Sequence, residues 1–314
     1  MTKIQWTEKT WNPIIGCSKI SPGCQNCYAE KMAWRLANIG LSNYHKTCCL
    51  RGIYDHNKNI TKHASPSWNG KTAFVESAID KPLQWKKPSM IFVCSMGDIF
   101  HESVPFAWVT EVMYMIAQCR LIHTFQILTK RPERMKEYFR LPKTYYKQNR
   151  PEEWPLPNLW LGVTAENQEQ ADKRIPILLD IPAAVRFVSV EPMLEDINLG
   201  PYLYSDYEKA SHDNQLIIPA NGFNHKKLDW VIVGCESGPK RRPCPHHWVS
   251  SIVSQCDDSS VPVFVKQLAL RRDKAGRNVT GLPGLWDESD RLVVSKNPEE
   301  WPDHLQVREF PKAR

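Results

Sequence analysis

Short apolar runs recur along the chain, and each is followed by polar residues. Six such runs lie at residues 90–94, 125–128, 159–163, 186–190, 230–233 and 261–265. They are rich in β-branched residues, apolar on both faces and too short for helices, which is typical of buried parallel strands. Residues 11–15 form another apolar run, which could be the first strand of the set.

Between these runs lie stretches with helical character. They cover about residues 25–37, 105–119, 131–139, 167–179 and 246–256. Pro105 and Pro132 stand where a proline can open a helix. The alternation of strand and helix predicts a parallel sheet covered by helices. Six or seven such βα units favour a full or partial TIM-like barrel over a small open sheet.

The predicted barrel has two interruptions and an extension. We expect residues 1–270 to form the barrel, with polar insertions at about 41–88 and 196–228. Residues 271–314 are punctuated by glycine and proline, and we expect them to form a C-terminal extension packed on the barrel. Residues 292–294 are a candidate strand within that extension.

In such barrels the active site lies at the carboxyl ends of the strands. Chemically capable residues follow the runs at these ends, namely Cys17, Asp98, Lys130, Glu166, Glu191, Glu236 and Lys266. Polar residues end many strands, and Lys266 could simply pair with a glutamate of the barrel. Charged residues after nearly every run nevertheless favour a common site.

Composition limits the setting of this site. The chain has 314 residues, of which 42% are hydrophobic, and no run of eighteen apolar residues. We therefore expect no membrane-spanning helix, and the first residues lack the apolar core of a signal peptide. The ten cysteines are then better interpreted as a few metal ligands plus buried side chains than as a disulfide framework. Together these features predict a cytoplasmic protein.

The chain is mildly basic, with a formal net charge of +7, and it contains twelve tryptophans. Basic clusters at residues 86–87, 240–242 and 271–274 could contact phosphates, and some tryptophans could stack on bases. For any single cluster, a solvated surface is the more ordinary explanation.

Three cysteines stand within eleven residues, as Cys17, Cys24 and Cys27 in a C-x6-C-x2-C pattern. Three thiolates on a short loop can bind three irons of a [4Fe–4S] cluster and leave the fourth iron open. Zinc is the main alternative, but a structural zinc site needs a fourth ligand. Distant pairs at residues 48–49 and 246–247 could supply it.

The cysteine loop after a first barrel strand resembles that of the radical SAM superfamily, whose usual spacing is C-x3-C-x2-C. Motifs along most of the chain resemble a phage-associated and bacterial family of unknown function with a radical-SAM-like barrel. These motifs include Trp11-Asn-Pro, Cys27-Tyr-Ala-Glu30, Leu128-Thr-Lys-Arg-Pro132 and Gly234-x-Glu236-Ser-Gly-Pro239. The resemblance implies a [4Fe–4S] cluster that cleaves S-adenosylmethionine reductively, giving a radical that takes hydrogen from a substrate.

The resemblance also implies roles for residues around the cluster. Ser95, Gly97 and Asp98 occupy the position of a motif that binds the amino group of the cofactor. Thr164, Glu166 and Glu191 could hold the ribose hydroxyls, and Lys130 with Arg131 could meet a carboxylate or phosphate. Glu236 and Ser237 could contact the adenine or methionyl part.

The sequence therefore predicts a radical SAM enzyme with an unidentified substrate, which could be a nucleotide or a nucleic-acid base. Such an enzyme would need an electron donor of the flavodoxin or ferredoxin type. The alternative is a non-catalytic iron–sulfur or zinc protein that binds nucleic acid or a partner protein. A metal-dependent hydrolase using His101 is a third possibility, but the early strands lack its ligand pattern.

Overall fold

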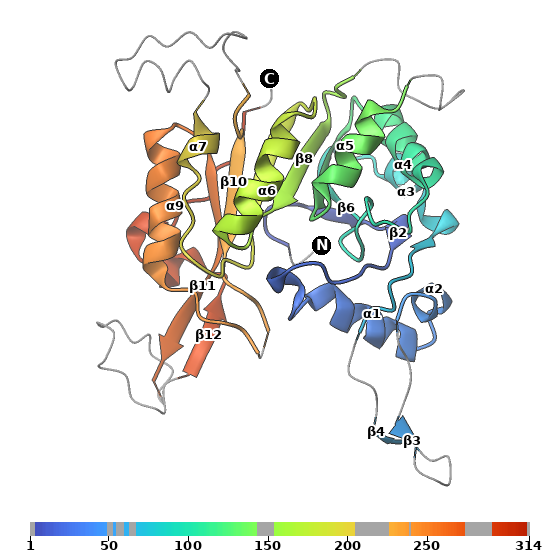
Figure 1. The fold of residues 1–314 in the computed structure, drawn as a ribbon, viewed down its shortest axis with the longest axis horizontal. Coiled ribbons are helices and arrows are strands. Elements are labelled where there is room, and N and C mark those ends of the chain that lie inside the picture. Colours follow the sequence, from blue (N-terminus) through green and yellow to red (C-terminus); the bar gives the residue numbers. More distant parts are fainter. Residues whose placement is uncertain are drawn as a thin grey trace. The chain divides into compact units, whose positions relative to one another are not determined.

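The structure is a computed structural model, and it divides into two compact units. Unit 1 comprises Met1–Val163 and Asp180–Ala184, and unit 2 comprises Thr164–Leu179 and Val185–Arg314. The structure describes residues 4–48, 67–142, 154–204, 226–238, 240–273 and 291–312, with the backbone of 53–54 and 60–62. Figure 1 traces both units and labels their elements.

Unit 1 is built on parallel strands that alternate with helices. Strands β1 (Lys9–Trp11), β6 (Ser89–Val93), β7 (His123–Thr129) and β8 (Leu159–Thr164) pair in that order, all parallel. Helices α1 (Tyr28–Asn38), α4 (Phe106–Gln118) and α5 (Pro132–Arg140) come between them along the chain. All described residues of β8 are buried, as the apolar run predicts.

Within the predicted insertion at 41–88, the elements formed by the described residues are all short. They are α2 (Ser42–His45), β3 (Ile53–Tyr54), β4 (Ile60–Lys62), β5 (Ala73–Phe74), the 3-10 helix η2 (Glu76–Ala78) and α3 (Lys81–Gln84). The first apolar run is split, because Pro13 interrupts it and a proline lacks the N–H that a strand ladder needs. Beyond Pro13, β2 (Ile14–Ile15) turns away to pair with β5 in an antiparallel ladder.

Unit 2 repeats the alternation of strands and helices. Strands β9 (Val185–Val190), β10 (Trp230–Gly234) and β11 (Val263–Arg272) pair in parallel. Helix α6 (Gln168–Leu179) precedes β9, and α7 (Gly200–Leu203) and α9 (His246–Asp258) come between the strands. Strand β12 (Arg291–Ser295) adds to β11 in antiparallel pairing, which confirms the strand predicted at 292–294. Two 3-10 helices, η4 (Pro298–Glu300) and η5 (Asp303–Leu305), follow it.

The mixed α/β class and the positions of the main helices and strands are confirmed. Neither unit closes its own described strands into a barrel. A boundary at residue 271 stays a prediction. No described helix is both long and apolar enough to span a bilayer.

Candidate cluster-binding site

The three cysteines lie on one loop of unit 1, between β2 and α1. Cys17 follows Gly16, whose φ of 95° places it in the left-handed region that glycine tolerates best. Cys24 ends the 3-10 helix η1 (Pro22–Cys24), and Cys27 is the N-cap of α1. All three thiols are partly exposed and free of disulfides.

Burial and neighbouring charges shift the pKa values of two of these thiols. Burial raises the pKa of Cys17 to about 12, and the negative charge of Cys27 adds to this rise. Burial also raises the pKa of Cys27, where the charge of Cys24 acts in the same direction. The backbone N–H groups of Ala29 and Glu30 oppose the rise at Cys27, because the first turn of a helix favours negative charge. The first turn of α1 therefore directs two amides at Cys27.

Arg131 is the central side chain beside the loop, and it is 4% exposed. Its Nη1 lies 3.6 Å from Cys17 Sγ and 3.1 Å from Asp98 Oδ2. Its Nη2 donates to the carbonyl and hydroxyl oxygens of Ser18, at 3.1 and 2.9 Å. Its Nε donates to Glu102 Oε1 at 2.9 Å. One guanidinium thus ties the start of the cysteine loop to two carboxylates.

Asp98 is buried, at 6% exposure, and its carboxylate is already occupied by protein donors. Thr129 Oγ1 donates to both of its oxygens, at 2.8 and 2.9 Å. The backbone N–H of Phe100 donates to Oδ1, and that of Lys130 reaches Oδ2 at 3.3 Å. A cofactor amino group would have to share these oxygens, so the role predicted for Asp98 towards the cofactor stays a prediction.

The other residues predicted after β6 also lie beside the loop. Ser95 donates its hydroxyl to Asn12 Oδ1 at 3.1 Å. Gly97 forms a parallel bridge with Gly16, and a Cβ on Gly97 would lie 2.9 Å from the carbonyl oxygen of Gly16. The backbone at Gly97 therefore makes a close approach to the cysteine loop. The side chain of Lys130 forms no ion pair with a described residue, although its positive charge lowers the pKa of Cys27.

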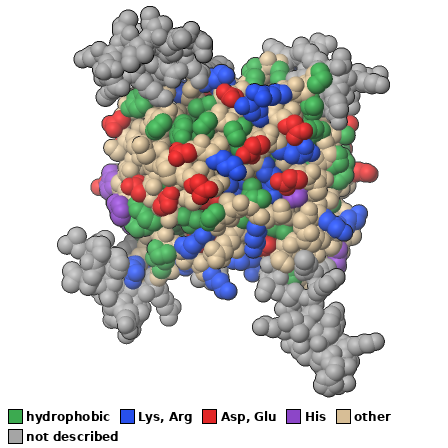
Figure 2. All heavy atoms as spheres, viewed as in Figure 1, with side chains coloured by type: hydrophobic (Ala, Val, Ile, Leu, Met, Phe, Trp, Pro, Cys, Tyr) green, Lys and Arg blue, Asp and Glu red, His purple; other side chains and the backbone are tan. Residues whose placement is uncertain are grey.

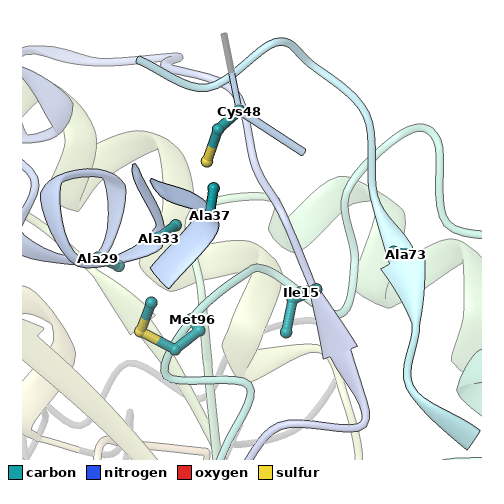
Figure 3. Close-up of a cluster of buried hydrophobic side chains, with 7 residues drawn as sticks. All are labelled: Ile15, Ala29, Ala33, Ala37, Cys48, Ala73 and Met96. Atoms are coloured by element: carbon teal, nitrogen blue, oxygen red, sulfur yellow. The ribbon is translucent and has the colours of Figure 1, made fainter. Parts of the chain in front are cut away.

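Helix α1 begins where the cysteine loop ends, at Cys27. Figure 3 shows Ala29, Ala33 and Ala37 of α1 in a buried apolar cluster with Ile15 and Met96. Cys48 belongs to the same cluster and is 4% exposed, so its position is that of a packing residue. Cys49 lies outside the described residues.

Glu30 anchors the outer part of the loop. It is 3% exposed, and its carboxylate pairs with Lys19 Nζ at 2.9 Å and accepts the N–H of Trp68 at 2.9 Å. Lys19 belongs to the segment between Cys17 and Cys24, so this buried acid fixes the long gap of the cysteine pattern to α1.

In unit 2 the predicted glutamates all pair with basic residues of the same unit. Glu166 Oε2 lies 2.9 Å from Arg174 Nη1, and both side chains are almost fully buried. Lys266 Nζ lies 2.9 Å from Glu191 Oε1, so the pairing considered for Lys266 is confirmed. The third pair joins Glu236 Oε1 to Arg242 Nη2 at 2.6 Å.

Thr164 and Ser237, the remaining predicted residues of unit 2, differ in exposure. Thr164 is 2% exposed, and its carbonyl accepts from Arg174 at 2.7 Å. Ser237 is exposed. The structure thus places Ser95, Gly97, Asp98 and Lys130 beside the cysteine loop in unit 1, and Thr164, Glu166, Glu191, Glu236 and Ser237 in unit 2.

The donor set can be tested against the groups it was predicted to hold. Among the described residues, no three or more His, Cys, Asp or Glu side chains converge closely enough to hold one metal ion. A single zinc with sulfur ligands at about 2.3 Å needs such convergence. A cubane cluster binds each thiolate to a different iron, so its thiols lie near one another without meeting at a point. Three thiols that are free of disulfides and share one loop, with Arg131 Nη1 at 3.6 Å from Cys17 Sγ, are compatible with a cluster of this kind.

Comparison with known proteins adds a family but no activity. A family model described as "Protein of unknown function (DUF5131)" matches residues 1–290. The chain belongs to the DUF5131 family. No curated protein and no solved structure matches it significantly.

Sequence reasoning undervalued several residues of this DUF5131 site. The sequence predicted for Arg131 only a contact with a carboxylate or phosphate, shared with Lys130. It predicted for His101 only a role as a metal ligand in a hydrolase. His101 Nε2 lies 2.8 Å from Ser18 Oγ, and burial lowers its pKa, as does the nearby Arg131. The run that follows Phe125–Leu128 contains Arg131, so the signal was present, but nothing in the sequence distinguished the buried Arg131 from the partly exposed Lys130 beside it.

Three arginines of the predicted basic clusters are engaged by other residues of this DUF5131 chain. Arg242 pairs with Glu236, and Arg272 Nη2 lies 2.8 Å from Glu300 Oε2. Arg241 donates to two backbone carbonyls. On the face shown in Figure 2, basic and acidic side chains are interspersed. A nucleic-acid substrate therefore stays a prediction.

Proposed function

We propose that Cys17, Cys24 and Cys27 bind a [4Fe–4S] cluster and that the protein is a radical SAM enzyme with a partial βα barrel. The observation that carries the proposal is the loop itself. It presents three free thiols close together, beside the buried Arg131 and the N-terminal amides of α1. When bound, the cluster would hold S-adenosylmethionine at its open iron and supply the electron for its reductive cleavage.

The residues of the chain have separate tasks in this proposal. The amides of α1 and the cations Lys130 and Arg131 offset the negative charge of the thiolates. Lys130, which has no ion-pair partner among the described residues, suits a cofactor carboxylate or a substrate phosphate. Glu30 pairs with Lys19 within the loop, and Gly97 packs closely against Gly16 at its start.

The remaining parts of the proposal concern partners and setting. An acidic redox protein of the flavodoxin or ferredoxin type would deliver the electron in the cytoplasm. The substrate class favoured by the basic charge of the chain is a nucleotide or a nucleic-acid base. The cofactor roles predicted for Thr164, Glu166, Glu191, Glu236 and Ser237, which all belong to unit 2, stay predictions.

One observation favours a second function, a non-catalytic iron–sulfur protein. Asp98, Glu166, Glu191 and Glu236 all form ion pairs with arginine or lysine. Carboxylates engaged in this way are poorly placed to hold ribose hydroxyls or an amino group. A cluster that never meets S-adenosylmethionine would be compatible with such a network.

The test is anaerobic purification followed by reconstitution with iron and sulfide. We expect about four irons and four sulfides per chain, and formation of 5′-deoxyadenosine after addition of dithionite and S-adenosylmethionine. The triple variant with alanine at the three loop cysteines should stay colourless. Cys119→Ala is the matched control, because Cys119 is buried at the end of α4 and should leave the iron content unchanged.

A cluster without cofactor cleavage would favour the non-catalytic function. Stoichiometric iron and sulfide in the triple variant would refute the assignment of the ligands.

A further inference from the structure

The guanidinium of Arg131 is fixed beside Cys17 by contacts on every side. The residue is the N-cap of α5, its N–H donates to Thr129 Oγ1 at 2.9 Å, and Pro132 follows it. Its two terminal nitrogens bracket the start of the cysteine loop, with Nη1 on Cys17 Sγ and Nη2 on both oxygens of Ser18. A planar, forked donor is needed for this pattern, and lysine cannot reproduce it.

Two carboxylates share this one cation. Asp98 is buried, with its side chain 7% exposed, whereas the side chain of Glu102 is 63% exposed. The charge of Asp98 raises the pKa of Cys17, and the charge of Arg131 acts in the opposite direction. Arg131 thus stands between an anionic pair and the sulfur that would bind iron.

From this geometry we infer that Arg131 is a positioning residue that sets the reduction potential of the bound cluster through Cys17. The inference rests on the proposed function, because it needs a cluster on the loop. It adds a control of the electron-accepting step by a residue that acts through the sulfur of Cys17.

The sign of the effect follows from charge. Reduction adds one electron to the cluster, and a cation that donates a hydrogen bond to a ligand sulfur stabilises the more negative state. Removing the charge of Arg131 leaves Asp98 and Glu102 unscreened, so reduction becomes harder. Removing the charge of Glu102 has the opposite effect, because Arg131 keeps its place with one anion fewer.

The experiment is a redox titration of reconstituted protein under anaerobic conditions, followed by visible and electron paramagnetic resonance spectra. For Arg131→Gln we expect the equilibrium constant for one-electron reduction to fall about tenfold, a shift of about −60 mV. Glu102→Gln should raise it about threefold, or about +30 mV. Arg131→Lys should recover part of the loss, since the charge returns without the fork.

Arg134→Gln is the matched control. Arg134 lies on the same helix, one turn further along, and pairs with Glu137 at 3.1 Å. We expect the equilibrium constant for one-electron reduction of this variant to stay within about twofold of the wild-type value.

The outcomes separate the inference from the proposed function. A wild-type protein that binds no iron and sulfide refutes the proposed function and takes the inference with it. A normal cluster whose potential is the same in wild type and Arg131→Gln, or that shifts equally in Arg134→Gln, refutes the inference alone. If Arg131→Gln does not fold, the exposed Glu102→Gln still decides, because an unchanged or lowered potential there contradicts the inference.

Discussion

Replacing Asp98 with asparagine tests the buried ion pair at the centre of the site. The substitution keeps the shape of the side chain but removes its charge, and it places an NH2 group among donors. Asp98 and Arg131 form a pair whose side chains are 7% and 4% exposed, at 3.1 Å. Breaking such a buried pair by removing one partner costs about 3–5 kcal/mol.

We expect the lower end of that range, because Glu102 still compensates Arg131 at 2.9 Å. A loss of about 3 kcal/mol in the free energy of unfolding corresponds to a fall of about 6–12 °C in the melting temperature of a unit of this size. The assay is urea unfolding followed by tryptophan fluorescence, with samples of equal iron content so that loss of a cluster does not mimic loss of folding.

Glu102→Gln is the control, because it removes the other carboxylate partner of the same arginine. Its side chain is 63% exposed, so we expect a loss of less than about 1 kcal/mol. Equal losses in the two variants, or a loss below about 1 kcal/mol for Asp98→Asn, would refute the view that the buried pair of Asp98 and Arg131 stabilises unit 1.

Two further substitutions probe the loop and unit 2. Gly97→Ala would place a Cβ 2.9 Å from the Gly16 carbonyl oxygen, so we expect the iron content after reconstitution to fall at least by about half. The control is Gly200→Ala, whose Cβ would meet only the Asn198 side chain and which should bind iron normally. Equal iron content in the two variants would contradict the close approach at Gly97. Glu166→Gln should lower the free energy of unfolding by about 3–5 kcal/mol, because it leaves the buried charge of Arg174 without its anion. The control is Asp180→Asn, which removes the half-exposed acid that pairs with Lys136 and should cost less than about 1 kcal/mol. Similar losses of the two variants in urea unfolding would contradict this ranking.

The individual strands and helices could be predicted because buried positions are apolar and recur at the spacing of each element. Strands such as Val185–Val190 are buried on both faces, so they stand out as apolar runs. The helix at Phe106–Gln118 could be predicted from Pro105 at its start and from the helical spacing of its apolar residues. The closure of the strands into a barrel could not be predicted, since the pattern of a strand is the same in an open sheet and in a closed one.

The site was harder to predict than the fold. The three cysteines are visible because they cluster in sequence, but the partners of a carboxylate are set by packing. Glu166 and Glu191 were assigned to a cofactor, whereas the structure shows each of them in an ion pair, with Arg174 and Lys266. The arginine that contacts Cys17 lies 114 positions away in the chain, and no local pattern reports a contact of that kind.

The central claim is that three thiols hold a cluster with one open iron. Mössbauer spectra of protein reconstituted with iron-57 test it directly, recorded before and after addition of S-adenosylmethionine. We predict that about one quarter of the iron signal shifts on addition of the cofactor, because only the iron without a cysteine ligand can bind it. A spectrum in which no iron changes, or in which the label is absent from protein with intact Cys17, Cys24 and Cys27, would contradict the claim.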